Sequence, residues 1–214
     1  MRWVILALFA AVIAAYDNLR DEMSIPTGGA LEGCVMRLVN YLSENHVFGK
    51  KQALNIVVDA GTGTTAVGLA LGALSLGLPW KVTAVMLADK IDGYRKREQK
   101  LISEFLRIPL FLSVGRALSG VNAGIVQWVE RCLPRKFGNV LKGEVEECQK
   151  IARQTGILVD PIYTLAAWDL ATLLSQKEEG DNKLVMLHTG GTLGMFGLVQ
   201  RYKSYFKMPE EGVI

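Results

Sequence analysis

Residues 57–68 read VVDAGTGTTAVG, so that a short β-branched run passes through a glycine-threonine turn into a helix of small residues. The start of a helix presents free backbone N–H groups and the positive end of the helix dipole, and both attract anions. Glycine lets the backbone approach a ligand because it has no Cβ, and threonine adds a hydroxyl donor. The turn therefore predicts a phosphate-binding site made by Gly61, Thr62, Gly63, Thr64 and Thr65.

Two other interpretations of this turn remain open. Close packing of a helix on a strand also requires glycine, without any ligand. The order GTGTTA at residues 61–66 also fits the loose dinucleotide pattern G-x-G-x-x-A. Asp89, just past the next expected strand, would then bind a ribose hydroxyl of NAD(P) in a Rossmann-type domain. The G-K-[ST] ending of a P-loop is absent, which disfavours a nucleoside triphosphatase.

A second stretch repeats this plan near the other end of the chain, where residues 185–194 read VMLHTGGTLG. Its turn follows an expected strand, and open parallel sheets bind their ligands at the carboxyl ends of strands. Considered alone, Thr189 is expected to cap the following helix. His188 is expected to lie in the core with its ring nitrogens hydrogen-bonded. Tyr163, considered alone, is likewise expected to be a packed aromatic residue.

Strands and helices alternate along the chain, which indicates an α/β protein. Short apolar runs predict buried parallel strands at residues 54–58, 82–87 and 183–187. Apolar residues at helical spacing predict helices at residues 31–42, 64–76, 93–106, around 125–131, 144–155, from 160 onward and 190–206. Gly156 is expected as a C-cap, and Asp160-Pro161 as the start of the next helix. We therefore expect a three-layer open parallel sheet with helices on both faces.

The composition fits a folded chain and excludes several classes of function. Of the 214 residues, 50% are hydrophobic and 21% are charged, which predicts a sizeable core. The net charge of +3 comes without a basic block, so nucleic-acid binding is not expected. Cys34, Cys132 and Cys148 have no metal or redox spacing and are expected to be free thiols. With two histidines in the chain, we expect no histidine-based metal site.

The first residues are apolar without interruption from Trp3 to Ala15. This run is shorter than the ~20 residues of a membrane span, and it resembles the hydrophobic region of a secretory signal peptide. A buried first helix or strand is the alternative. We therefore expect two parts, an apolar N-terminal segment at residues 1–30 and an α/β domain at residues 31–214.

Three motifs, taken together, resemble the D-cysteine desulfhydrase and 1-aminocyclopropane-1-carboxylate (ACC) deaminase family. They are DAGTGTT at residues 59–65, DPIYT at residues 160–164 and HTGG at residues 188–191. The resemblance runs from about residue 39 to residue 206 and corresponds to the C-terminal part of these enzymes. It implies the large domain of a tryptophan synthase β-like fold and the cofactor pyridoxal 5'-phosphate (PLP). Thr164 and Thr189 replace a glutamate and a leucine of the deaminase branch, which favours the desulfhydrase branch.

The resemblance also implies a role for each motif. Residues 61–65 would cradle the cofactor phosphate. Thr189 would place its hydroxyl near the pyridine nitrogen and, unlike a carboxylate, would not hold that nitrogen protonated. Tyr163 would face the substrate as an acid/base or positioning group. The implied activity is β-elimination from D-cysteine, or a similar small amino acid, to sulfide, ammonia and pyruvate.

Two departures from the family weaken the expectation of full activity. Phe137-Gly138 matches a Tyr-Gly pair of the family, and a phenyl ring cannot transfer a proton. No lysine precedes Lys50, so the family's Schiff-base lysine and small domain have no match. We therefore expect a truncated protein with the phosphate half of the site and weak or no activity by itself. It would form a homo-oligomer or act as a silent partner of a full-length relative, in mitochondria or cytoplasm.

Overall fold

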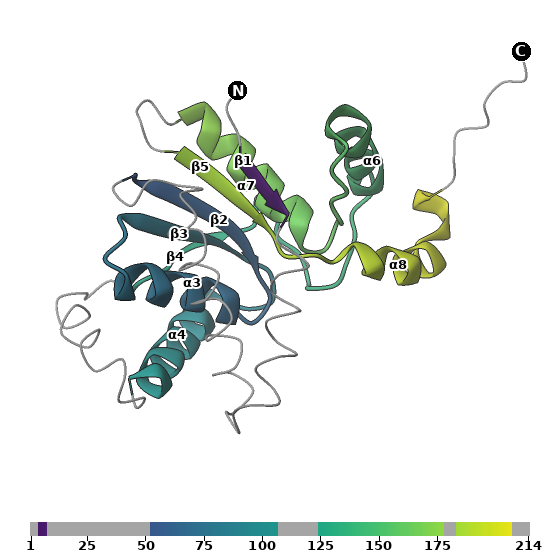
Figure 1. Ribbon diagram of the computed structural model, residues 1–214. Helices are drawn as coiled ribbons and strands as arrows, with labels where there is room; N and C mark the ends of the chain where they lie inside the picture. Colours follow the sequence, from purple (N-terminus) through teal and green to yellow (C-terminus); the bar gives the residue numbers. More distant parts are fainter. Residues whose placement is uncertain (1–3, 8–51, 107–123, 178–182, 207–214) are drawn as a thin grey trace, which may run out of the picture.

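The core of the protein is a five-stranded parallel sheet with the strand order β1-β5-β2-β3-β4 (Figure 1). The computed structural model describes residues 4–7, 52–106, 124–177 and 183–206. The strands are β1 (Val4–Ala7), β2 (Leu54–Ala60), β3 (Trp80–Met86), β4 (Gln127–Glu130) and β5 (Lys183–His188). The last strand in the sequence, β5, therefore lies between β1 and β2.

Helices cover both faces of the sheet, as the alternation of elements predicts (Figure 1). Helix α3 (Thr64–Ser75) packs on β2 and β3, and α4 (Ile91–Phe105) packs against α3. Helix α7 (Thr164–Lys177) covers the other face and contacts β5, β2 and β3. The expected three-layer α/β architecture is thus confirmed.

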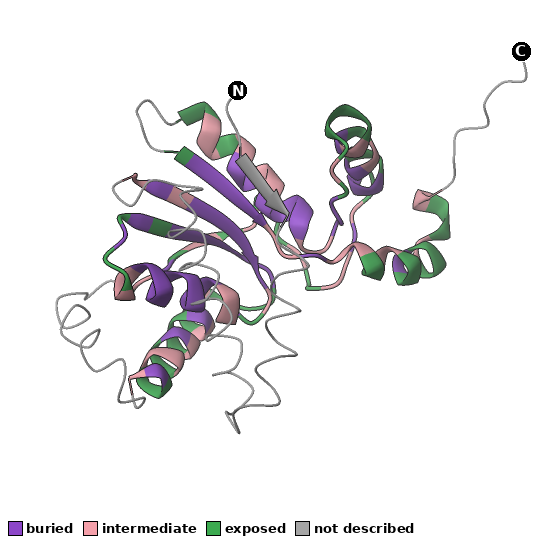
Figure 2. Cartoon of the chain, viewed as in Figure 1, coloured by how far each residue is buried: buried purple, intermediate pink, exposed green. Residues whose placement is uncertain are grey.

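The alternation of side chains along β2 explains why both faces must be covered. Ile56 and Val58 join the core beneath α3, whereas Val57 joins the core beneath α7, and all three are buried. Successive side chains of a strand point to opposite faces, so an unbroken apolar run needs a helix layer on each side. Figure 2 shows the resulting buried strands between the two layers.

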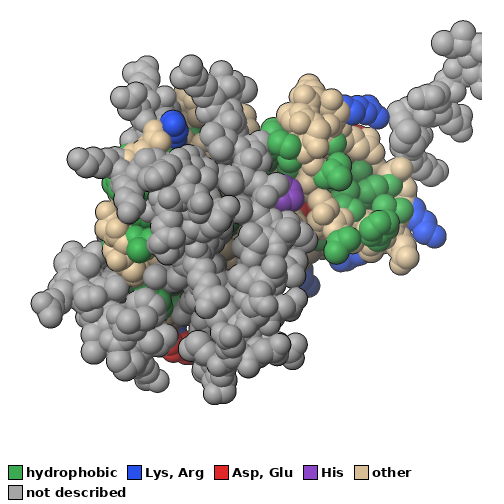
Figure 3. Space-filling view, viewed as in Figure 1, with side chains coloured by type: hydrophobic (Ala, Val, Ile, Leu, Met, Phe, Trp, Pro, Cys, Tyr) green, Lys and Arg blue, Asp and Glu red, His purple; other side chains and the backbone are tan. Residues whose placement is uncertain are grey.

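The remaining helices lie beyond the carboxyl end of β5 and beside the start of α7 (Figure 1). They are α6 (Glu144–Thr155), η2 (Thr192–Gly194), α8 (Met195–Arg201) and η3 (Lys203–Tyr205). A small core joins α6 to α8 through Val140, Val145 and Leu198. Exposed hydrophobic side chains gather over α8 (Figure 3), with Leu193 and Phe196 the most exposed of them.

Several boundaries agree closely with the sequence. The expected helices at 64–76 and 144–155 are α3 and α6, and Gly156 is the C-cap of α6 with φ of 76°. The strands expected at 54–58, 82–87 and 183–187 are β2, β3 and β5. Asp160 caps the turn at residues 161–163, and α7 begins just after it.

Two expectations are wrong. The helix expected around residues 125–131 is instead strand β4, which pairs with β3 from Gln127 to Glu130. The single helix expected at 190–206 begins only at Thr192, because Gly190 and Gly191 adopt φ angles of 107° and 97° that a helix cannot contain. The rest is divided into η2, α8 and η3, and α8 ends where Tyr202 leaves the helical region with φ of −121° and ψ of 47°.

Other expectations fall on segments outside the described residues. The helix expected at 31–42 and Cys34 lie there. Strand β1 arises within the apolar segment at 1–30, which is the strand alternative considered for that segment. The division into parts 1–30 and 31–214 stays a prediction, because residues 8–51 are not described. In the described part of the chain no helix has the length and apolarity needed to cross a membrane, and no residue cluster there is suited to a metal ion.

Candidate functional site

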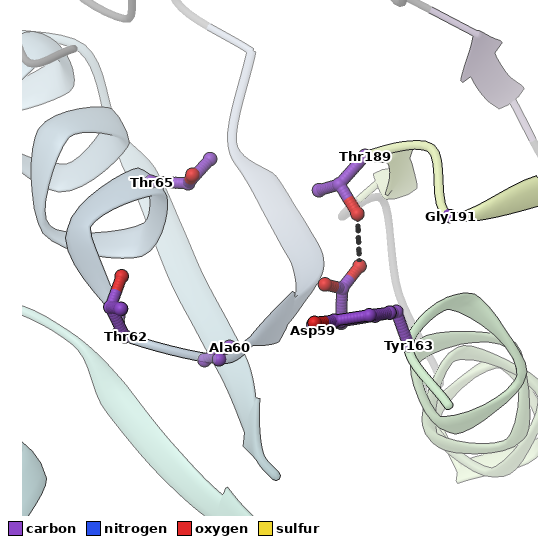
Figure 4. A pocket seen from close by; sticks show the side chains of 9 residues that line it. Asp59, Ala60, Thr62, Thr65, Tyr163, Thr189 and Gly191 are labelled. Carbon is purple, nitrogen blue, oxygen red and sulfur yellow. Dashed lines mark hydrogen bonds between the residues drawn. The ribbon is translucent and has the colours of Figure 1, made fainter. Parts of the chain in front are cut away.

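A pocket of about 330 Å³ opens at the carboxyl ends of β2 and β5 (Figure 4). It is lined by residues 59–63, Thr65, Tyr163, Thr189 and Gly191. The glycine-threonine turn, Tyr163 and Thr189 therefore meet in one place, although they are far apart in the sequence. Thr64 is the one member of the predicted set that does not line the pocket.

The start of α3 forms one wall of this pocket. Gly63 is the N-cap of α3 with φ of 88°, and no side chain caps the helix there. Thr62 and Thr64 contact each other through their hydroxyl oxygens at 3.2 Å. The Thr64 N–H donates to the Thr62 hydroxyl at 3.5 Å, and the N-cap residue Gly63 has no side chain with which to cap the helix. Backbone N–H groups at the start of α3 can therefore be presented to an anionic ligand.

A buried tyrosine fixes the backbone just before this turn. The Tyr94 hydroxyl lies 2.6 Å from the carbonyl oxygen of Ala60 and 2.9 Å from that of Gly61, to which it can donate. It also accepts hydrogen bonds from the backbone N–H groups of Leu87 and Ala88, at 3.1 and 3.0 Å. One side chain from α4 therefore ties the carboxyl ends of β2 and β3 together and positions the turn.

Thr189 and Asp59 form the opposite wall of the pocket (Figure 4). The Thr189 hydroxyl donates a hydrogen bond to Asp59 Oδ1 over 2.5 Å. Burial raises the pKa of Asp59 to about 6, with the nearby Asp160 charge also raising it and the Thr189 hydrogen bond opposing the rise. Thr189 does not cap the following helix, since Gly191 is the N-cap of η2 and lacks a side-chain cap.

Asp59 is a site residue that the sequence reasoning missed. It is the next-to-last residue of the buried strand β2, directly after the apolar run at residues 56–58, and is only 6% exposed. A single carboxylate at the carboxyl end of such a strand was the available signal, because buried carboxylates are rare unless they have a partner or a function.

The raised pKa of Asp59 predicts how stability depends on pH. An acid whose pKa is higher in the folded state stabilises that state below its unfolded pKa, and this contribution is lost as the pH rises through the folded pKa. For Asp59 the window runs from the ordinary value of 3.8 to about 6. We expect Asp59→Asn to gain about 2 kcal/mol over the wild type between pH 4 and pH 7, measured by urea unfolding at each pH. An equal difference at both pH values would contradict this.

Tyr163 precedes α7 and is positioned by the cap of that helix. Asp160 is 1% exposed and accepts hydrogen bonds from the backbone N–H groups of Ile162, Tyr163 and Thr164 at 2.9, 2.9 and 3.1 Å. Burial and the charges of Asp160 and Asp59 raise the pKa of the Tyr163 phenol. Tyr163 therefore keeps its proton at neutral pH and can donate a hydrogen bond in the pocket.

Phe137 lies beside Tyr163, where the family resemblance places a second tyrosine. The two rings meet edge to face with centroids 5.5 Å apart. Phe137 lines a separate pocket of about 740 Å³ and not the pocket of Thr62 and Thr189, and its phenyl ring contributes packing but no proton. His188 is satisfied as expected, with Nε2 at 2.7 Å from the Leu158 carbonyl oxygen and Nδ1 accepting from the Gly190 N–H.

A buried ion-pair cluster supports the turn that carries Tyr163, and the sequence reasoning missed it. Arg131 donates to the carbonyl oxygens of Pro161 and Ile162 at 2.6 and 3.1 Å. Glu144, at the start of α6, pairs with both Arg131 and Arg135. Their side chains are 10% exposed or less, so the cluster is shielded from water. The charged side chains lie within 13 positions of one another, but the two carbonyl groups that Arg131 contacts are 30 and 31 positions away, and no local pattern connects them.

Asp89 is not part of this pocket. Its carboxylate pairs with Arg97 at 2.5 Å and accepts from the Lys90 backbone N–H at 2.8 Å. It lines a separate pocket of about 740 Å³ beyond the carboxyl ends of β3 and β4. The ribose-binding role that a dinucleotide domain requires is therefore not favoured.

Known proteins are similar to this chain over most of its length. A rice (Oryza sativa) protein assigned as mitochondrial D-cysteine desulfhydrase 2 is 53% identical over 182 residues, which cover 83% of this chain and 44% of that protein. The mitochondrial bifunctional D-cysteine desulfhydrase/ACC deaminase of Arabidopsis thaliana is 27% identical over 187 residues, covering 85% of this chain and 42% of that protein. No protein-family model matches the chain.

A solved structure agrees with the sequence comparisons. The crystal structure of an ACC deaminase homologue superposes with a TM-score of 0.64 at 25% identity, over 91% of this chain and 57% of that one. The chain thus spans about half the length of the relatives that it matches. By sequence and by fold, the protein is related to the D-cysteine desulfhydrases and ACC deaminases, and its sequence is nearer to the rice desulfhydrase than to the bifunctional enzyme.

Proposed function

We propose that the pocket binds PLP, with the phosphate at the start of α3 and the pyridine nitrogen beside Thr189. The observation that carries this proposal is the meeting of the start of α3, Tyr163 and Thr189 around one pocket of about 330 Å³. The volume lies within the range of small cofactor sites. The anionic and the aromatic parts of the cofactor would each meet suitable groups, because Thr62 and Thr65 line one side and Thr189 and Asp59 the other.

In this role each residue has a distinct task. Bound PLP supplies an electron-withdrawing ring that stabilises negative charge on the α-carbon of an amino acid. The turn at residues 61–65 would hold its phosphate through backbone N–H groups and the threonine hydroxyls. Tyr163, with its raised pKa, would hold a proton beside the substrate and donate it to a leaving group.

The relatives suggest the substrate class. D-cysteine or a similar small amino acid is the proposed substrate, with sulfide, ammonia and pyruvate as products, and the mitochondrion is the proposed location. Among the described residues that line the pocket there is no lysine. We therefore expect the chain by itself to bind PLP without the absorption band of a Schiff base and to release little or no sulfide from D-cysteine. Pairing with a longer relative would be the way to complete the site.

The direct test is an absorbance titration of the chain with PLP. Thr62→Ala and Thr65→Ala should each weaken binding about tenfold to a hundredfold, the effect of losing one hydrogen bond to a charged group. Thr172→Ala is the matched control, because its hydroxyl bonds to the Trp168 carbonyl within α7 and lies outside the pocket. Saturable binding of NADH with no response to PLP would refute the proposal and restore the dinucleotide interpretation.

A further inference from the structure

The hydrogen bond between Thr189 and Asp59 limits what the Thr189 hydroxyl offers to a ligand. A hydroxyl has one proton and two acceptor lone pairs. That proton is donated to Asp59 Oδ1 across 2.5 Å, a length typical of a bond to an ionised carboxylate. Both residues line the pocket. Toward the pocket, Thr189 therefore presents lone pairs and acts as an acceptor.

The groups around Asp59 keep this arrangement in place at neutral pH. Asp160, before α7, and His188, at the end of β5, act on the charge of Asp59 in opposite directions. The Tyr163 phenol faces the same carboxylate from the start of α7. Asp59 is paired with Val85 in β3, and the first turn of α3 contains no acidic residue. With a pKa of about 6, Asp59 is ionised above neutral pH and accepts a hydrogen bond from the Thr189 hydroxyl.

We propose that Asp59 is a positioning residue that turns the Thr189 hydroxyl into an acceptor, so that the pocket selects PLP with a protonated ring nitrogen. This inference rests on the proposed function. Only a ring nitrogen that carries a proton can donate to an oxygen whose own proton is engaged elsewhere. The expectation from the resemblance, that a threonine leaves the ring nitrogen unprotonated, considers the hydroxyl without its buried partner.

When Asp59 loses its charge, the hydrogen bond between the Thr189 hydroxyl and the ring nitrogen is expected to reverse its direction. A missing carboxyl group cannot accept a hydrogen bond from Thr189, and a protonated one accepts it more weakly and can itself donate to the hydroxyl oxygen. The Thr189 hydroxyl is then free to donate to an unprotonated ring nitrogen. The charge of Asp59 and the proton on the ring are thereby coupled through one hydroxyl group. A threonine with an ionised buried partner would support the electron-withdrawing form of the ring, as a carboxylate placed directly beside the nitrogen does.

The test measures the ring nitrogen itself, by ¹⁵N NMR of ring-labelled PLP bound to the full chain across a pH series. Asp59→Leu removes the acceptor, Thr189→Val removes the hydroxyl, and Thr189→Ser retains it as the matched control. We expect the pH midpoint of the bound ring nitrogen to fall by about one to two pH units in D59L and T189V, the effect of one hydrogen bond to a charged group. T189S should behave like the wild type. Wild-type midpoints in D59L and T189V would overturn the inference.

A second arm needs no ligand and separates the two proposals. In the free chain, the carboxyl ¹³C resonance of Asp59 should titrate at a higher pH in T189V than in the wild type, because the hydrogen bond from Thr189 lowers the pKa of Asp59. An unchanged Asp59 midpoint would overturn the inference even if PLP binds. Failure of the wild type and T189S to bind PLP, with the Asp59 midpoint shifted as expected, would instead refute the proposed function and leave the Asp59–Thr189 geometry intact.

Discussion

Alanine in place of Glu144 is expected to lower the free energy of unfolding by about 3–5 kcal/mol, the cost of leaving buried charges without their partner. Glu144 pairs with Arg131 and Arg135, whose side chains are 10% and 5% exposed, and it accepts the Leu141 backbone N–H at 2.8 Å. Removing the carboxylate leaves two guanidinium groups in a poorly solvated place. Urea unfolding monitored by circular dichroism measures the loss.

Glu147 provides the matched control for this prediction. It lies on the same helix and pairs with Lys150 at 3.3 Å, but both side chains are about half exposed. Glu147→Ala should therefore cost at most about 0.5 kcal/mol, as for other exposed pairs on a helix. In E144A the turn at Pro161 and Ile162, to which Arg131 donates, should also lose order, which would move Tyr163. Equal losses in the free energy of unfolding of E144A and E147A would show that the buried cluster stabilises the fold no more than an exposed ion pair does.

Alanine in place of Gly63 is expected to destabilise the fold and to distort the glycine-threonine turn at residues 61–65. Gly63 has φ of 88°, and a Cβ there would lie 2.8 Å from the Trp128 ring and 3.3 Å from the Tyr94 ring. The left-handed backbone alone costs a non-glycine residue about 1–2 kcal/mol. The overlap with Trp128 adds the cost of overpacking, typically about 1–3 kcal/mol. Thermal unfolding and the PLP titration together measure the two effects.

Gly143 separates backbone strain from the steric overlap. It is also the N-cap of a helix, α6, with φ of 93° and no side-chain cap, but a Cβ there would meet nothing within 4 Å. Gly143→Ala should therefore cost only the strain of the left-handed backbone and leave PLP affinity unchanged. If G63A and G143A lose the same stability and bind PLP equally well, the contact with Trp128 is not what fixes the turn.

The parts of the fold that were predictable are those with a local cause. Strand β2 contains the apolar, β-branched run at residues 56–58, and α6 combines an amphipathic pattern with a glycine that stops it. The glycine-threonine turn at residues 61–65 likewise combines a strand end, glycines and threonines within a few residues. In each case the nearest neighbours in the sequence determine the local structure, and the tertiary fold agrees with them.

The parts that were not predictable depend on residues distant in the sequence. Strand β4 was mistaken for a helix because its short sequence has no clear period, whereas in the structure Glu98 of α4 accepts the N–H groups of Ile125 and Val126 and of the Trp128 indole. The partnership of Asp59 with Thr189 crosses 130 positions. Such contacts arise only when the sheet has assembled, so a single sequence does not reveal them.

The place of β5 between β1 and β2 has a consequence for how the chain matures. As a nascent chain leaves the ribosome, β2, β3 and α3 can associate first, but the edge of β2 that will receive β5 stays open until residue 188 has emerged. An open strand edge is prone to pair with foreign strands. A chaperone that shields this edge during synthesis would therefore protect the protein at its most vulnerable stage, before the pocket between β2 and β5 exists.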